Sequence, residues 1–470
     1  MLTGMKRSSK LAIPFLGLLL AGVSVILPGC GSGVTNPIDN STTPTAKYVG
    51  ADRCVVCHKR VHESWSQTGH AGALGLLKSI GQDTNTACLP CHTVGFGEEG
   101  GYVDNPTTPN LANVQCESCH GPGLDHVNNV ADKTLRPTKS ISSAVCGKCH
   151  TDAHVAGAPS IPTYEEWAAG SHGKVSEHPG DSFNVGSSLL SCGVCHSGDY
   201  RQQVLNEGNT ITDTFLKDVP IDQMNSQTCA ICHDPHEQTG NDKGIGIEPG
   251  HDFQLRYPKV AFPTPSDNTT LTTNPARFNI CGQCHHSRGA NWTAGSRGPH
   301  HSIQANMYAG EMDSSDNKTS LVPNEGSVHS FVPGQCTTCH MYRVDVVDLP
   351  GTAEDTPAIG GHSFAINFKA CFGVAGCHPT EENVIALQTT FQAEIQAGLD
   401  SIKTRLGAVS TWEYSSSGGP TDQKTVSNDI KKVRFLYYWI INDLSLGIHN
   451  PEYARSIINK ANALLTSAGK

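Results

Sequence analysis

The stretch that decides the fold is Cys54-Val55-Val56-Cys57-His58, because its spacing recurs along the whole chain. Two cysteines separated by two residues and followed at once by histidine form the attachment sequence for haem c. The thiols lie one helical turn apart and reach the two vinyl groups of one porphyrin edge. The adjacent imidazole then lies under the ring as an iron ligand. Seven further copies follow, at Cys88/Cys91/His92, Cys116/Cys119/His120, Cys146/Cys149/His150, Cys192/Cys195/His196, Cys229/Cys232/His233, Cys281/Cys284/His285 and Cys336/Cys339/His340.

Zinc knuckles and disulfides are the alternative interpretations of closely paired cysteines. The chain has 23 histidines in 470 residues. A histidine follows any one pair by chance about once in 20. Eight such coincidences together are negligible, and no second pair recurs at the regular offset that zinc sites need. The sequence therefore predicts eight covalently attached haems.

A ninth cysteine pair is irregular. Cys371 and Cys377 have five residues between them, and His378 follows directly. Gly373 and Gly376 would let the longer loop bulge away from a porphyrin. An ordinary disulfide, or a haem held by Cys377 alone, are the alternatives. We expect a ninth haem c with His378 as an iron ligand.

Fourteen histidines remain beyond the nine that follow cysteine pairs. Neutral imidazole is a good iron ligand, and two on one iron give a closed, low-spin site. A histidine just after an attachment motif cannot easily reach the far face of its own haem, but it can reach a neighbouring iron. Sequence context selects eight second ligands: His70, His126, His172, His236, His300, His329, His362 and His449. Further candidates are His62, His154 and His286.

Three segments resemble multihaem cytochromes related to hydroxylamine oxidoreductase: 48–92, 116–123 and 299–310. The outer-surface multihaem cytochromes of metal-reducing bacteria are more similar still, and the resemblance covers most of 48–470. It implies other cytochromes or redox proteins as partners and metal oxides as a terminal acceptor. It also implies that His449 is a distal haem ligand, for which helix capping is the alternative.

The N-terminus is typical of an export signal. A basic start precedes an apolar run at 11–26, which is shorter than the roughly 20 residues that span a membrane. The run leads into Leu27-Pro28-Gly29-Cys30, which resembles a bacterial lipobox. We expect a lipoprotein signal peptide at 1–29, a flexible tether at 30–47 and a lipid anchor at Cys30. An uncleaved anchor or a free thiol is the alternative. The expected location is the outer membrane, on its periplasmic face or at the cell surface.

The formal net charge of −10 favours basic partners and argues against nucleic acid. Nine attachment sites between residues 54 and 378 leave too little chain for an ordinary core around each haem. With 48 glycines and 27 prolines, we expect a multihaem domain at 48–378 that is mainly α and irregular loops, with little or no sheet. Haems packed in so small a volume must have near neighbours.

The segment 379–470 contains no cysteine and is expected to be helical. Apolar residues recur at three- and four-residue steps from Val384 to Leu406, which predicts an amphipathic helix. A second helix is expected over Thr425–Leu446. Asn450 and Pro451 then predict an N-cap and first turn of a third. These helices could serve packing or an oligomer.

Two functions fit the motifs. The first is an electron carrier at the outer membrane, in anaerobic or extracellular respiration, with two histidines on every iron. The second is a reductase of the nitrite, hydroxylamine or tetrathionate type, which needs one open iron. Related reductases often mark that iron with lysine in place of the motif histidine, and the chain has no such motif. The carrier is the favoured hypothesis, and no catalytic residue is assigned.

Overall fold

The computed structural model describes residues 47–151, 162–174, 186–212, 214–240, 253–256, 280–312, 321–332, 334–344, 359–372 and 377–470. The chain divides into two units, Met1–Pro44 and Thr45–Lys470. The expected signal peptide, the anchor at Cys30 and most of the tether lie outside the described residues. No helix in the described ranges is long and apolar enough to cross a membrane.

Short helices and irregular loops make up most of the described chain. The α-helices are α1 (Ala51–Trp65), α2 (Ala73–Ser79), α3 (Leu89–His92), α4 (Cys116–His120), α5 (Leu124–Asn128), α6 (Thr163–Ala169), α7 (Gly186–His196), α8 (Gly198–Arg201), α9 (Cys229–Cys232), α11 (Gln304–Ala309), α12 (Cys336–His340), α13 (Lys369–Phe372), α14 (Glu381–Leu406), α15 (Asn428–Asn442) and α16 (Pro451–Ser467). The 3-10 helices are η1 (Gly69–Gly72), η2 (Pro109–Leu111), η3 (Lys133–Leu135), η4 (Cys146–Lys148), η5 (Ser171–Gly173), η7 (Ile221–Gln223), η9 (Ile280–Gln283), η10 (Val328–Phe331), η11 (Val409–Thr411), η12 (Ser415–Ser417) and η13 (Gln423–Thr425), and η6 (Gln202–Asn206) is a π-helix. Within these ranges only isolated β-bridges occur, so the predicted fold class is confirmed.

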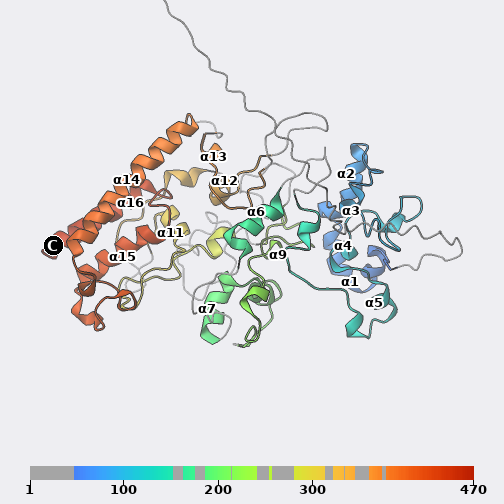
Figure 1. Cartoon of the computed structure of the whole chain (residues 1–470), viewed down its shortest axis with the longest axis horizontal. Coiled ribbons are helices and arrows are strands. Elements are labelled where there is room, and N and C mark those ends of the chain that lie inside the picture. The colour runs from blue at the N-terminus through green and yellow to red at the C-terminus, as the bar shows by residue number, and fades with distance from the viewer. Residues whose placement is uncertain are drawn as a thin grey trace, which may run out of the picture. The chain divides into compact units, whose positions relative to one another are not determined.

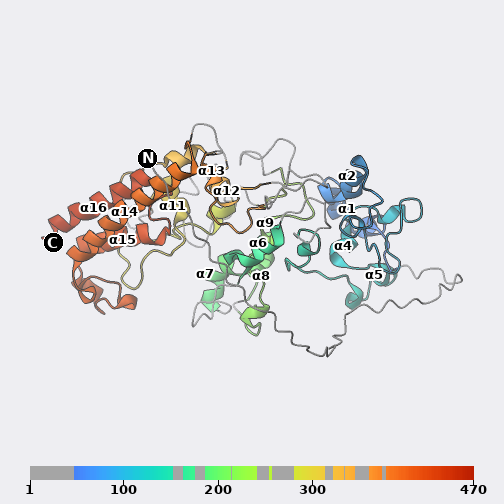
Figure 2. The same ribbon diagram turned by 45° about the horizontal axis from the view of Figure 1, so that its top comes forward.

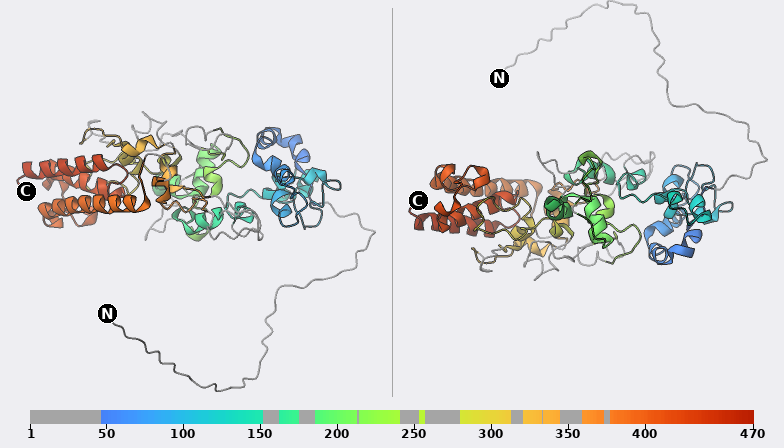
Figure 3. Two further views of the ribbon diagram at one scale, coloured as in Figure 1. Left: turned by 90° about the horizontal axis from the view of Figure 1, so that it is seen from above. Right: turned by 90° about the horizontal axis from the view of Figure 1, so that it is seen from below.

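The three long C-terminal helices pack against one another. Figures 1 and 2 show α14, α15 and α16 side by side in orange and red. Both views of Figure 3 show the same lengthwise packing. Thr380 caps α14 by accepting a hydrogen bond from the Asn383 backbone N–H, and Phe391, Ile395 and Leu399 are among its buried residues. The amphipathic helix predicted from Val384 to Leu406 is confirmed.

The second predicted helix was too long at both ends. The Ser427 side chain accepts a hydrogen bond from the Ile430 backbone N–H and starts α15 at Asn428. At the other end Leu444 has a φ of 62°, which a right-handed helix cannot include. The third helix is confirmed, because the Asn450 side chain accepts from the Tyr453 backbone N–H.

A buried arginine joins the loops before α15 to this helix. Arg434 is fully buried and its guanidinium lies 3.7 Å from the centre of the Tyr414 ring. It donates hydrogen bonds to the carbonyls of Trp412 and Ala294 and to the Gln423 side chain. Charge-assisted hydrogen bonds of this kind are about twice as strong as neutral ones. Arg434 therefore fixes these loops against α15.

A buried carboxylate, that of Glu117, likewise connects separate segments of the chain near α1 and α4. The Glu117 side chain accepts hydrogen bonds from the backbone N–H groups of Val49, Gly50 and Gly123. Gly50 has a φ of 79°, and its backbone approaches that of Asn110 so closely that a Cβ would clash. The start of α1 is thus held against the loop that follows α4.

Candidate haem sites

Each regular attachment motif lies on a short helix or at its end, and we number the nine motifs in chain order. Motif 1 lies on α1, motif 2 on α3, motif 3 on α4, motif 4 at η4, motif 5 on α7, motif 6 on α9, motif 7 at η9 and motif 8 on α12. In motifs 4, 6 and 7 the histidine N–H donates to the carbonyl of the first cysteine at 2.9 Å. Motif 1 is kinked at His58, where φ is −106° and ψ is 38°. The backbone of each regular motif therefore holds its two thiols and its imidazole close to one another.

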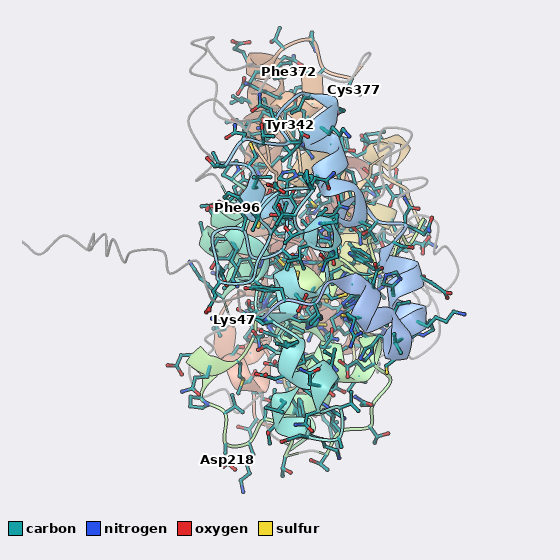
Figure 4. All side chains as sticks on the ribbon, turned by 90° about the vertical axis from the view of Figure 1, so that its right-hand side faces the viewer. Lys47, Phe96, Asp218, Tyr342, Phe372 and Cys377 are labelled. Carbon is teal, nitrogen blue, oxygen red and sulfur yellow. The ribbon has the colours of Figure 1, made fainter. Side chains whose placement is uncertain are left out.

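The irregular motif 9 closes the same turn. His378 N–H donates to the Cys371 carbonyl at 3.3 Å, as His150, His233 and His285 do to the first cysteine of their motifs. Residues 373–376, with the predicted bulge, lie outside the described residues. Cys371 and Cys377 do not form a disulfide with each other. Figure 4 labels Phe372 and Cys377, the described residues on either side of this segment. The extra residues are accommodated without moving the histidine away from the first cysteine.

Six motif histidines face a second imidazole from a distant part of the chain. The paired rings, with the distances between their centroids, are His150–His70 at 6.1 Å, His120–His236 at 6.0 Å, His285–His172 at 6.1 Å, His196–His300 at 6.3 Å, His233–His362 at 6.3 Å and His340–His449 at 6.2 Å. Every second imidazole in this set was among the eight expected from sequence context. The pairs join segments up to 129 residues apart, as in His233–His362.

The ring separations match two ligands on one iron. A metal–imidazole bond is about 2 Å, and the ring centroid lies about 1.1 Å behind the bonding nitrogen. Two imidazoles on opposite sides of one ion therefore have centroids about 6.2 Å apart. The six observed separations all lie between 6.0 and 6.3 Å.

Hydrogen bonds at Nδ1 leave Nε2 of these rings available as a ligand. Nδ1 meets a backbone carbonyl oxygen in His92, His120, His233, His340 and His362. In His285 it meets Oε1 of Gln304 at 3.2 Å, and in His300 it meets Oγ of Ser302 at 3.1 Å. The Ser302 hydroxyl itself donates to the His286 carbonyl, so it accepts from His300. The lone pair on Nε2 then points to the iron position.

Burial keeps several of the second imidazoles neutral, which is the form that binds iron. Burial lowers the pKa of His172 and of His362 to about 4. It lowers the pKa of His300 to about 3, with Arg288 adding to the effect. His449 differs: burial lowers its pKa, but the charge and hydrogen bond of Asp443 raise the pKa above its ordinary value overall. Its Nδ1 lies 2.6 Å from Oδ1 of Asp443.

Five histidines of the predicted sites have no opposing imidazole ring in the described ranges: His58, His92, His126, His329 and His378. The charge of His378 does reach His329, whose pKa is lowered mainly by burial. His126 is half-buried, and its buried Nδ1 has no hydrogen-bond partner among the described residues. Of the further candidates, His62 lies 5.3 Å from the Trp65 ring, and His154 lies outside the described residues.

Comparison with known proteins agrees with this arrangement. The family model for cytochrome c554 and c-prime matches residues 53–121, which contain motifs 1 to 3. Over 100 residues the chain is 37% identical to cytochrome c-554 of Nitrosomonas europaea; this covers 18% of the chain and 42% of that relative, less than half its length. The structure of the outer cell wall cytochrome OcwA matches with a TM-score of 0.55 at 18% identity, over 89% of this chain and 100% of that one. The chain is a multihaem c-type cytochrome.

Haem c fits the donors that this cytochrome provides. The described ranges hold no group of three or more His, Cys, Asp or Glu side chains around one metal position. Each regular motif instead supplies two thiols and one imidazole on or beside a helix, and in six motifs a second imidazole lies opposite the first. That donor set matches a porphyrin, which supplies four ligands of its own and leaves two axial positions.

Cysteines of different motifs lie close together in this cytochrome. The pairs in which one thiol most strongly shifts the pKa of the other are Cys54–Cys116, Cys91–Cys149, Cys146–Cys229, Cys195–Cys284 and Cys281–Cys336. They join motifs 1 and 3, 2 and 4, 4 and 6, 5 and 7, and 7 and 8. Weaker charge effects between thiols add motifs 3 and 4 through Cys119 and Cys149, 6 and 7 through Cys232 and Cys284, and 8 and 9 through Cys339 and Cys371. The attachment sites therefore form one connected series, 1-3-4-6-7-8-9, with motif 2 beside motif 4 and motif 5 beside motif 7.

Sequence reasoning missed two charged residues of these sites. Arg201 is buried and donates to the Cys284 Sγ at 3.7 Å and to the Gln283 side chain. Asp443 is buried beside His449. Asp443 lies only six residues before His449, so a carboxylate close to a candidate ligand was the available signal. No sequence signal links Arg201 to motif 7.

Proposed function

We propose that the chain is an electron carrier with nine haem c groups, at least six of them held between two histidines. The observation that supports it best is the set of six imidazole pairs at the separation of two axial ligands. Haem c supplies a one-electron couple between ferric and ferrous iron. Two imidazoles close both axial positions, which suits electron transfer and leaves no position for a substrate.

The closeness of these cysteines supports the same function. Cysteines that lie close together would hold the edges of their two porphyrins near each other, and short gaps between edges are what fast electron transfer needs. The series 1-3-4-6-7-8-9 would give a continuous path along the attachment sites. The second cysteines of the end motifs 1 and 9, Cys57 and Cys377, are exposed, as is Cys119 of motif 3. We propose that redox partners, among them other cytochromes or metal oxides, exchange electrons near these two ends.

The location belongs to the same proposal. The lipobox-like stretch supports a lipid anchor at Cys30 and a place on the outer membrane, on the periplasmic face or at the cell surface. Growth by anaerobic or extracellular respiration would use such a carrier. Metabolic labelling with a fatty acid analogue tests the anchor: labelling must disappear in the Cys30→Ser variant.

A reductase with one open iron is the second candidate. His58 and His92 favour it, because neither faces a second imidazole within the described ranges. Electron paramagnetic resonance of the oxidised protein, with and without cyanide or nitrite, separates the two functions. The carrier predicts low-spin iron that ignores the added ligand. A high-spin iron that binds nitrite would establish the reductase and reject the pure carrier.

A further inference from the structure

The imidazole of His449 meets a different kind of hydrogen-bond acceptor from the other ligand histidines. Its Nδ1 lies 2.6 Å from the Asp443 carboxylate. The Nδ1 atoms of seven other ligand histidines meet neutral carbonyl, amide or hydroxyl oxygens: those of His92, His120, His233, His285, His300, His340 and His362. A second carboxylate near a ligand histidine is Asp234, which is 3.7 Å from Nδ1 of His236, beyond hydrogen-bond distance.

Asp443 is also placed where water cannot screen its charge. Its side chain is 0% exposed. Its second oxygen accepts a hydrogen bond from the Ser445 hydroxyl, and within the described ranges His449 is its ion-pair partner. Asp234, in contrast, is 19% exposed and is paired with Arg256 at 2.6 Å. Asp443 therefore acts on His449 without a competing cation, whereas the charge of Asp234 is largely balanced.

The sign of the effect follows from charge. A carboxylate that accepts a hydrogen bond from Nδ1–H gives the imidazole partial anionic character and makes it a stronger donor to the metal. Reduction removes one positive charge from the iron site, and a buried carboxylate then loses part of its compensation. Both effects favour the oxidised form. Both effects are larger when the carboxylate is buried, and the Asp443 side chain is fully buried.

We propose that Asp443 tunes the motif 8 site, so that the haem held by His340 and His449 has a lower midpoint potential than the other haems with paired histidines. This inference rests on the proposed function, because it takes His449 as an iron ligand. Motif 8 joins motif 7 to motif 9 in the series of attachment sites. A low potential there makes reduction of this site the least favourable step between motif 9 and the remaining sites.

Spectroelectrochemical titration of the full-length, haem-loaded protein tests the proposal. In Asp443→Asn, the equilibrium constant for one-electron reduction should rise tenfold or more for one haem, which is a shift of about 59 mV or more to higher potential. The other haems should keep their potentials. The matched control, Asp234→Asn, should shift the motif 3 haem by less than half as much.

Two spectra separate tuning from a merely structural role. Asp443→Asn must keep the motif 8 iron low-spin, because the asparagine side-chain oxygen can still accept a hydrogen bond from the His449 Nδ1–H. A high-spin signal would mean that Asp443 only positions His449, and an unchanged or lowered potential with a low-spin signal would overturn the tuning. His449→Ala reports on the proposed function by itself: it must convert one iron to high-spin. If it does not, His449 is no ligand, and the failure lies in the ligand assignment.

Discussion

Replacing His300 by alanine should open the iron site of motif 5, while the same change at its neighbour His301 should not. The two residues are adjacent in the chain and their rings are stacked, with centroids 4.1 Å apart. His300 faces the motif histidine His196 at a centroid distance of 6.3 Å. We therefore expect His300→Ala to remove an iron ligand, whereas His301→Ala removes an exposed ring that stacks on His300.

His301 cannot easily replace the missing ligand. Metal–ligand distances vary by only about 0.2 Å, so its ring would have to move by roughly 4 Å. The chain on both sides is anchored: the Pro299 carbonyl accepts from the Asn442 side chain at 2.5 Å, and the Ser302 hydroxyl donates to the His286 carbonyl at 2.8 Å. With nine haems, loss of one ligand should move about one ninth of the low-spin iron to high-spin.

Electron paramagnetic resonance of the two oxidised variants measures this difference. Pyridine haemochrome absorbance gives the haem content per chain and normalises the spectra. His300→Ala should gain one high-spin iron that binds cyanide, and His301→Ala should match the unaltered protein. An unchanged spectrum for His300→Ala, or a new high-spin signal for His301→Ala, would refute the assignment of the pair.

Three further changes test other parts of the structure. Cys377→Ser should leave the ninth haem attached through one thioether at Cys371, which withstands denaturation, so intact mass should still show nine haems; a count of eight in the unaltered protein would reject motif 9. Arg434→Leu should lower the free energy of unfolding of the C-terminal helices by about 3 kcal/mol, because one buried and two partly buried acceptors lose their donor; chemical denaturation measures it. Glu117→Gln should destabilise the N-terminal segment by about 2 kcal/mol, since an amide cannot accept from three N–H groups, and hydrogen exchange at 47–127 measures that loss.

Exposed residues of the same types provide the controls. Arg455 pairs with Glu394 on the surface at 2.8 Å, so Arg455→Leu should change stability by less than about 1 kcal/mol. Glu63 forms an exposed pair with Lys59 at 3.7 Å, and Glu63→Gln should have no measurable effect. Equal losses in the buried and the exposed variants would contradict the role of burial.

The local features of this fold could be predicted because they depend on short sequence patterns. The spacing of Cys54, Cys57 and His58 predicts haem attachment from a stretch of five residues. Asn450 and Pro451 likewise predict the start of α16 from two residues. The end of α15 could not be predicted, because the apolar pattern continues past Asn442 while the backbone turns at Leu444.

The pairing of ligands depends on tertiary structure and could not be predicted. His70 follows motif 1 by twelve residues, but it faces His150 of motif 4. Sequence context identified His70 as a candidate ligand without identifying its iron. The role of Asp443 was also hidden, because only the turn between α15 and α16 brings its carboxylate to His449. The domain boundaries at 47/48 and 378/379 stay predictions.

Near-infrared magnetic circular dichroism of the fully oxidised protein tests the central claim most directly, because its low-spin band reports the pair of axial ligands on each iron. Normalised to haem content, the intensity should correspond to six or more haems with two histidines per chain. Fewer than six would contradict the assignment of the paired imidazoles as iron ligands, and with it the proposed electron carrier.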